Sequence, residues 1–183
     1  PEYTVVGVGR EDGKTAGEYA PIFFKQAKYT LLDQNTFWLC EKPDSVGMVG
    51  WDAALTRIAT WVKLQDKKTG QILMVVNTHF DHIGTEARRN SALLIIEKIK
   101  EIVGTSPAIL TGDFNVSEDW DAYKTITNNE FILKDAHKVA GKRTGVDFTY
   151  HNFGKIPAEK CEKIDFIFVT PQIRVISSYI PFS

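Results

Sequence analysis

Along most of this chain, hydrophobic side chains either alternate with polar ones or form short runs, and this pattern favours β-strands over helices. Residues 57–65 alternate between two sets of side chains, as a strand with two different faces does. Residues 72–77 form a nearly continuous apolar run, which is typical of a buried strand. Shorter apolar or aromatic runs predict further strands, and these lie at residues 21–28, 36–39, 108–110, 148–150, 163–169 and 175–180.

Two segments instead indicate helices. Over residues 86–103 apolar side chains recur at intervals of three and four, which places them on one buried face. Gly104 is expected to end this helix, and a second helix is predicted near residues 119–127. Polar segments that carry Gly or Pro predict loops at residues 10–17 and 41–51, and a turn at 66–70.

Many strands with two helices between some of them predict an α/β fold, a layered sandwich with mixed sheets. A doubly wound nucleotide-binding fold is disfavoured, because the chain has neither a GxGxxG turn after an early strand nor a GxxxxGK[ST] phosphate loop. The sequence contains no internal repeat and no low-complexity linker. Residues 1–183 are therefore expected to form one domain, or part of one.

Charge and composition narrow the function classes. The 183 residues include 22 basic and 23 acidic ones, a formal net charge of −1, whereas general nucleic-acid binders are usually more basic. No apolar run approaches the ~20 residues that cross a bilayer. Cys40 and Cys161 lack the spacing of a metal site, so we expect plain thiols; a single disulfide is the alternative and would suggest export.

Polar side chains crowd the end of the buried run at 72–77. Asn77, His79, Asp81 and His82 can all bind phosphate, water or a metal, and α/β proteins place their sites where strands end in loops. The structural alternative is a strand terminus at which Asn and Asp cap a turn. We favour the functional interpretation of this segment.

A second polar pair follows the short strand at 108–110. Strand alternation would place Asp113 and Asn115 on one face, with Phe114 toward the core. A carboxylate and an amide oxygen are hard ligands suited to Mg²⁺ or Mn²⁺, and Asp113 is also able to orient or deprotonate a water. The alternative is an Asx-turn with a glycine that relieves strain.

Asp165 is the one acid in the otherwise apolar strand within residues 163–169. Burying a carboxylate without a partner is costly, so we expect Asp165 to have one. A histidine is the natural partner, because a carboxylate orients imidazole and favours its charged form. A structural ion pair with Lys or Arg is the alternative.

Three segments in this order resemble the endonuclease/exonuclease/phosphatase (DNase I-like) superfamily, namely NTHFDH at 77–82, LTGDFN at 110–115 and KIDFIFV at 163–169. The stretches GEYAPIFF, TFWL and GWDAALTRIATW are similar to a bacterial subgroup whose substrates are mostly undefined. The resemblance implies a four-layer α/β sandwich of two mixed sheets flanked by helices. It also implies divalent-metal-dependent hydrolysis of a phosphoester.

The resemblance assigns roles position by position. His79 would contact the scissile phosphate or assist the leaving group, and Asp113 would orient and activate the attacking water. Asn115 would hold phosphate or metal, and Asp165 would pair with a catalytic histidine. The cofactor would be Mg²⁺ or Mn²⁺, with Asp113 and Asn115 as its ligands. The candidate substrate contacts are Arg57, Tyr19, Asn77 and His82. Asp81 is not assigned a step in the reaction.

The chain also departs from the family pattern. The family's early Asn and metal-binding Glu have no counterpart before residue 17, and Glu18 is not in the right context to replace that Glu. The closing Ser-Asp-His segment is absent, and neither His137 nor His151 stands in its context. We expect a domain that lacks its first strands and final segment. By itself it should be weakly active or inactive, because a Mg²⁺ held by too few carboxylates binds poorly.

A phosphoesterase (phosphodiesterase, nuclease or phosphatase) is thus the favoured function. A catalytically inactive binding module on the same fold is the alternative, and a zinc hydrolase is disfavoured because no HExxH motif occurs. The partner is expected to be a phosphate ester, whether a small molecule, a lipid head group or a nucleic acid. Oligomeric state and compartment stay open, and export would require a signal peptide before residue 1.

Overall fold

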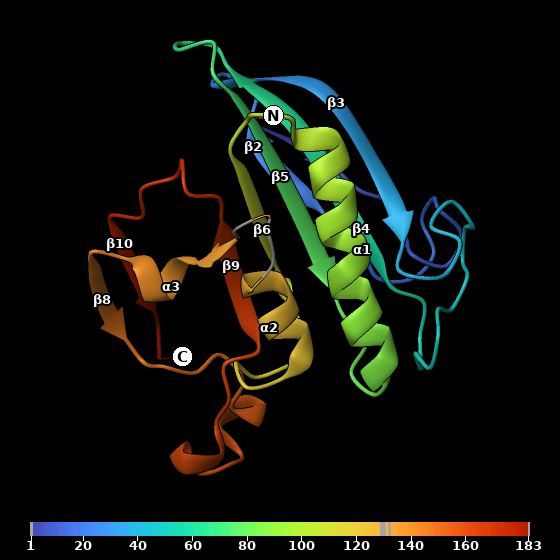
Figure 1. The fold of residues 1–183 in the computed structure, drawn as a ribbon, viewed down its shortest axis with the longest axis vertical. Helices are drawn as coiled ribbons and strands as arrows, with labels where there is room; N and C mark the ends of the chain where they lie inside the picture. The colour runs from blue at the N-terminus through green and yellow to red at the C-terminus, as the bar shows by residue number, and fades with distance from the viewer. Residues whose placement is uncertain (1, 129–130, 132, 183) are drawn as a thin grey trace.

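The computed structural model describes residues 2–128, 131 and 133–182. Its centre is a mixed six-stranded sheet, in which β5 and β6 are parallel and the other neighbouring pairs are antiparallel. In spatial order the strands are β3 (Tyr29–Trp38), β4 (Ile58–Asp66), β5 (Ile72–His79), β6 (Ala108–Asp113), β9 (Asp165–Val169) and β7 (Lys134–Asp135) (Figure 1).

Helices α1 (Thr85–Val103) and α2 (Asp121–Thr127) cover one face of this sheet (Figure 1). Helix α1 is the crossover that joins the parallel strands β5 and β6. It ends where predicted, because Gly104 adopts a φ of 59° that favours glycine. The largest apolar core lies between these helices and the sheet, and its fully buried members include Met74, Ile95, Ile99, Leu110, Phe114, Ile126 and Phe168.

The opposite face of the sheet carries a second layer of strands. Strands β1 (Tyr3–Val6) and β2 (Ile22–Lys25) form an antiparallel pair, which packs on Val62 and Leu64 of β4. Because β4 also packs Ala59 and Trp61 against the helices, both of its faces are buried. This layering confirms the predicted α/β class, although only the six-stranded sheet is mixed and the second layer is a two-stranded antiparallel pair.

Most of the remaining elements lie beside β9, and two short helical turns lie below it in the view of Figure 1. Strands β8 (Lys142–Gly145) and β10 (Ser177–Ile180) pair in parallel. Between β7 and β8 lies the single turn of α3 (Ala136–Val139). Two short 3₁₀ segments, η1 (Asn152–Gly154) and η2 (Ala158–Lys160), follow β8.

Most predicted elements are confirmed, including the turn at 66–70 and the long loop at 41–51. Strand β3 begins at Tyr29 rather than at residue 36, because pairing with β4 extends it into half-exposed, polar positions. The predicted strand at 148–150 is wrong, since only one isolated bridge joins Tyr150 to Glu162 and no ladder continues from it. Both cysteines are free thiols, as expected.

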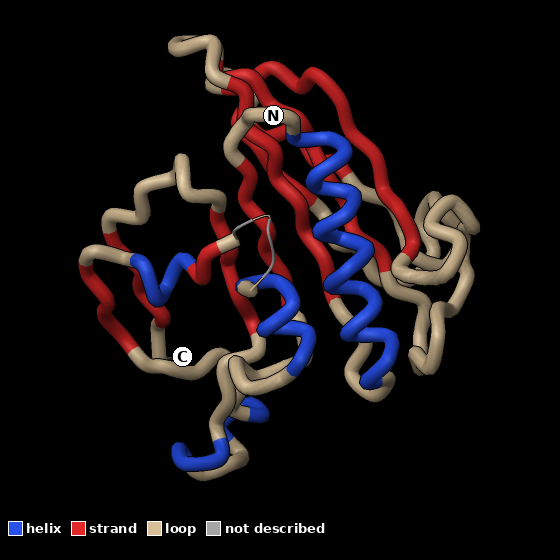
Figure 2. Tube along the Cα trace, in the orientation of Figure 1, coloured by secondary structure: helices blue, strands red, loops and turns tan. Residues whose placement is uncertain are grey.

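The helices within the described part of the chain are all too short or too polar to span a membrane. Figure 2 shows that the segments leaving β5 and β6 continue as loops at the same end of the sheet. Carboxyl ends of parallel strands meet at one edge of an α/β sheet, and ligands usually bind there. The fold therefore directs attention to the loops that follow His79 and Asp113.

Candidate active site at the carboxyl ends of β5 and β6

His79, Asp113 and Asp165 lie in one row across the sheet. His79 ends β5, Asp113 ends β6, and Asp165 begins the antiparallel strand β9. The strand register pairs His79 with Asp113, and Asp113 with Asp165. Because Leu110 and Phe166 face the helices, strand alternation turns all three polar side chains toward the opposite face. The sheet thus brings together three of the four predicted catalytic residues.

The row lies at the base of a cavity with a volume of about 570 Å³. This volume falls within the range of small-molecule sites. The cavity walls come from the segment before β2, from α3, from β10 and from the loop before β9. Wall residues with polar or aromatic side chains include Tyr19, Asp135, His137, Thr149, Lys163 and Tyr179.

Gly112 permits the close approach of β5 and β6 beside the row. A Cβ atom at this position would lie 2.2 Å from the backbone oxygen of Thr78. Any other residue would therefore push the two strands apart. This is a packing requirement between strands rather than the relief of turn strain that the sequence offered as an alternative.

Asn115 reaches the site by a turn and not by strand alternation, so the prediction that it shares a strand face with Asp113 is wrong. Strand β6 ends at Asp113, and Asn115 has a φ of 49°. Its backbone N–H donates to Asp113 Oδ1 at 2.9 Å, and its Nδ2 donates to the Phe80 carbonyl at 3.0 Å. The Asx-turn and the candidate function therefore coexist, while Phe114 is fully buried as predicted.

His79 lies between two carboxylates. Its Nε2 is 3.6 Å from Asp113 Oδ2, and its Nδ1 is 3.8 Å from Glu18 Oε2. Burial lowers the pKa of His79, and the positive charge of Arg57 lowers it further. The imidazole is accordingly neutral near pH 7, so it can accept one proton and donate another.

The two acids of the row are shifted in the opposite direction. Burial raises the pKa of Asp113, although the N–H of Asn115 and the charge of Arg57 oppose the shift. Desolvation by its surroundings also raises the pKa of Asp165, and the nearby charge of Asp113 adds to this. Neighbouring carboxylates with raised pKa values are typical of sites that act on protons or bind cations.

Asp165 does not meet the expectation of a buried acid with a histidine partner. It is exposed, because it is the first residue of β9 and faces the cavity. A hydrogen bond from Thr149 opposes the rise in its pKa. His79 contributes only electrostatically to Asp165, so the histidine partner that the family resemblance implies is not identified among the described residues.

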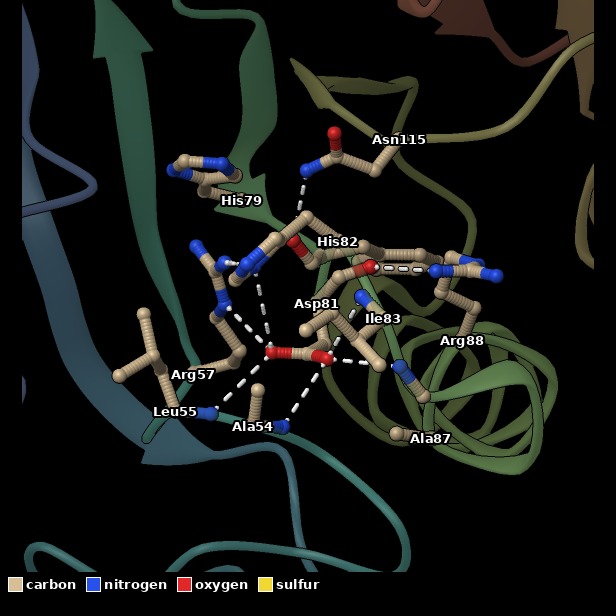
Figure 3. A network of polar contacts seen from close by, with 12 residues as sticks. Ala54, Leu55, Arg57, His79, Asp81, His82, Ile83, Ala87, Arg88 and Asn115 are labelled. Atoms are coloured by element: carbon tan, nitrogen blue, oxygen red, sulfur yellow. Dashed lines mark hydrogen bonds and ion pairs between the residues drawn. The ribbon is translucent and has the colours of Figure 1, made fainter.

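Arg57 is only 4% exposed and lies next to His79 (Figure 3). Its Nε is 3.3 Å from Asp81 Oδ1, and its Nη2 is 3.1 Å from His82 Nδ1. Burial and the charge of Arg10 lower the pKa of Arg57, although Asp81 opposes this. The structure therefore joins the predicted substrate contacts Arg57 and His82 directly, with Asp81 beside both.

The other two predicted substrate contacts line the cavity but have partners within the protein. Asn77 donates from Nδ2 to the Pro21 carbonyl at 3.0 Å and accepts from Thr111 Oγ1 at 2.9 Å. The Tyr19 hydroxyl donates to the Lys14 carbonyl at 3.0 Å. The bond from Asn77 ties the segment before β2 to strand β5, and a substrate role for Asn77 or Tyr19 stays a prediction.

Arg10 and Glu18 also reach the row, although no sequence pattern predicts them there. The Glu18 carboxylate is hydrogen-bonded to Arg10 and approaches Arg57 and His79. The sequence context of Glu18 argues against a role as the metal-binding Glu, and Arg10 lies in a segment that the sequence predicts only as a loop. Only folding of the loop at 10–17 over the sheet brings these two residues to the row.

The donor set around Asp113 suits a hard divalent cation. Mg²⁺ is commonly held by one or two carboxylates together with water and substrate oxygens. Asp113 supplies a carboxylate, and Asn115 commits its amide N–H to Phe80 and thereby leaves its carbonyl oxygen for another partner. Across residues 2–128, 131 and 133–182, no group of three or more His, Cys, Asp or Glu side chains is arranged to hold a metal.

Comparison with known proteins places this geometry in a family. No family model matches the chain. The crystal structure of an endonuclease/exonuclease/phosphatase from Bacteroides vulgatus is 68% identical with a TM-score of 0.98, and the match covers 100% of this chain and 70% of that one. A mannosyl-6-phosphatase from Bacteroides thetaiotaomicron is 39% identical with a TM-score of 0.89, over 97% of this chain and 66% of that one.

A viral protein is also similar to this chain in sequence. An uncharacterized protein of Acanthamoeba polyphaga mimivirus is 36% identical over 127 residues, which are 65% of this chain. The chain spans 46% of the length of that viral protein. High identity over the whole chain, together with the same α/β sandwich, confirms the resemblance seen in the three motifs. The chain belongs to the endonuclease/exonuclease/phosphatase family.

Proposed function

We propose that this chain carries the central part of a divalent-metal-dependent phosphoesterase site. The observation that supports this most directly is the row of His79, Asp113 and Asp165 at the base of a small-molecule-sized cavity. An acid with a raised pKa next to a histidine with a lowered pKa is a pairing suited to proton transfer. The chain spans only part of the length of its relatives, so the activity of a whole protein is also part of this proposal.

In this proposal the row hydrolyses a phosphoester by in-line attack of water. Asp113 orients the water and accepts its proton, for which a carboxylate with a raised pKa is better suited than an ordinary one. Neutral His79 donates a hydrogen bond to the phosphoryl group or the leaving oxygen. Arg57 adds a fixed positive charge beside the same position.

Two residues would hold the metal, and a third would act beside them. Asp113 and Asn115 would bind Mg²⁺ or Mn²⁺ through a carboxylate and an amide oxygen. When bound, the ion would supply charge neutralisation for the phosphoryl oxygens. Asp165 would pair with a catalytic histidine, which is the role that the family resemblance implies.

The proposed substrate is a small phosphoester. The cavity volume of about 570 Å³ suits a compact molecule, and polar side chains such as Lys163 and His137 line its walls. The similarity to a mannosyl-6-phosphatase favours sugar phosphates as the first compounds to test. A lipid head group and a short nucleic acid are the competing phosphate esters.

The test is hydrolysis of a panel of sugar phosphates, other phosphomonoesters and phosphodiesters, with Mg²⁺, with Mn²⁺ and with chelator. An Asp113→Ala variant is assayed in parallel. Metal-dependent turnover that the variant loses by several orders of magnitude would support the proposal. A folded protein that binds phosphate esters without turning any of them over would favour the binding-module alternative instead.

A further inference from the structure

Asp81 is an unusually well-satisfied buried carboxylate beside the candidate active site. It is 1% exposed and accepts hydrogen bonds from the backbone N–H groups of Ala54, Leu55, Ile83 and Gly84, as well as from Arg57 Nε (Figure 3). Although burial opposes it, these donors hold the pKa of Asp81 well below its usual range. Asp81 is therefore a permanent negative charge at physiological pH.

The contact with Asp81 leaves one edge of the Arg57 guanidinium uncommitted. Nε is engaged by Asp81 and Nη2 by His82, whereas Nη1 makes no hydrogen bond to any described residue. The nearest carboxylate oxygen to Nη1 is Glu18 Oε2, at 3.9 Å. Figure 3 shows the guanidinium end of Arg57 pointing toward His79.

The group that covers this edge lies at the surface. The Glu18 side chain is 60% exposed, whereas Arg57 Nη1 beneath it is buried, and the other contacts of Glu18 are with Arg10 and His79. At 3.9 Å the contact of Glu18 with Nη1 is longer than a hydrogen bond, so an incoming anion could take the place of the carboxylate beside Nη1. Arg57 cannot yield in the same way, because Asp81 and its buried surroundings hold it.

A second acid provides a contrast. Asp52 also accepts two backbone N–H groups, from Glu86 and Ala87 at the start of α1. Its carboxylate thus stabilises the helix start without contacting Arg57 in the described part of the chain. Asp81 and Asp52 both hold loops by accepting backbone N–H groups, but only Asp81 is seen to contact Arg57 in the described part of the chain.

We propose that Asp81 is a positioning residue, which holds the Arg57 guanidinium so that its Nη1 edge receives a phosphoryl group in place of the Glu18 carboxylate. This inference rests on the proposed function, because it assigns Arg57 to the phosphate of the substrate. Arginine suits the task, because its planar fork can face a carboxylate with one edge and a phosphate with another.

The test measures the affinity of the protein for inorganic phosphate by calorimetry, so it does not depend on turnover. Arg57→Ala should raise Kd about tenfold, the worth of one charge-assisted hydrogen bond. Asp81→Asn should raise Kd by a similar factor, and the double variant should bind no worse than Arg57→Ala alone. This non-additivity identifies an effect of Asp81 that acts through Arg57.

Asp52→Asn is the matched control. It should lower the melting temperature and leave the phosphate Kd within about twofold, because only a helix-capping contact is lost. If Asp81→Asn does not fold, Arg57→Lys decides the question. A lysine keeps the charge but cannot face Asp81 and phosphate together, so Kd should rise nearly as far as in Arg57→Ala.

Three results with the variants would overturn the inference: a folded Asp81→Asn variant with unchanged Kd, losses that multiply in the double variant, or Arg57→Lys with wild-type affinity. A wild-type protein that does not bind phosphate at all would remove the site and the inference with it. If phosphate binding follows the expected pattern but no phosphoester is hydrolysed, the proposed function fails and the role of Asp81 stands.

Discussion

The two faces of the six-stranded sheet are built from alternate residues of the same strands, yet they do different work. Toward α1 and α2 the strands present Met74, Val76, Leu110 and Phe168, which are all at most 1% exposed. Toward the opposite side, near the strand ends, they present the row of His79, Asp113 and Asp165. Neighbouring residues of one strand thus have different roles, because one packs in the core and the next faces the candidate site.

This comparison shows why the polar row is tolerable. Titratable groups with shifted pKa values are costly to bury, and the apolar face compensates with contacts that have nothing to do with the site. Substitutions on one face should therefore change the free energy of unfolding, and those on the other should change activity. Each of the following predictions tests how complete that separation is.

The largest effect is expected from Asp113→Asn. The amide cannot accept a proton from water, so kcat for the best phosphoester should fall roughly 10³-fold. The melting temperature should not fall, because the removed charge is disfavoured by burial. Asp33→Asn on exposed β3 is the matched control and should leave kcat unchanged. Activity retained by Asp113→Asn would remove Asp113 from its assigned role.

Phe168→Ala should have the converse result. Phe168 is fully buried and contacts the rings of Phe114, Phe166 and Tyr123. Its truncation should cost about 3–5 kcal/mol in the free energy of unfolding. Below the melting temperature, kcat/KM should remain within about threefold of wild type, since Phe168 lies on the helix side of the sheet, away from the row. A large loss of kcat/KM in the folded variant would show that the two faces are coupled.

Gly112→Ala should lower both the free energy of unfolding and the activity. Its added methyl group meets the Thr78 backbone oxygen and would push β5 from β6 at the site. We expect a loss of about 1–3 kcal/mol from overpacking. Displacement of His79 relative to Asp113 should also lower kcat by up to roughly 10²-fold. Gly70→Ala is the control for a stability loss away from the site, because a Cβ there meets nothing within 4 Å but the φ of 73° strains alanine, so stability should fall while kcat stays unchanged.

The smallest effect concerns pH. The pKa of Asp113 is raised in the folded state, so its favourable contribution to stability exists below its unfolded pKa of about 3.9 and is lost as pH rises through the folded pKa. Asp113→Asn should therefore be slightly more stable than wild type at pH 7, and this gain should vanish below about pH 4. Urea unfolding at both pH values, with chelator present, measures the difference. A gain that is independent of pH would contradict this account.

Much of the fold was predictable because its signals are local. Helix α1 and strands β4, β5 and β6 follow from apolar spacing, which depends only on near neighbours along the chain. The prediction at 148–150 failed for the opposite reason. A short aromatic segment becomes a strand only if another segment supplies a ladder, and at Tyr150 a single bridge forms.

Some residues of the candidate site were likewise predictable from local sequence, and others were not. His79, Asp113 and Asp165 were recognisable because each stands at the end of an apolar run that continues into a strand. Asn115 was recognised too, but for a geometric reason that does not hold, since a residue with positive φ carries it out of the strand. Arg10 and Glu18 had no comparable signal, because they belong to a loop whose position depends on long-range contacts.

The sequence by itself determined the class of the fold, the family, and which polar residues end β5 and β6, since periodicity and strand-end chemistry are properties of consecutive residues. Only the tertiary structure decided which groups share the site. It brought Asp81 to the N–H groups of Ala54 and Leu55, and Glu18 to Arg57 and His79. These contacts join segments far apart in the chain, and their distances exist only once sheet, helices and loops are packed together.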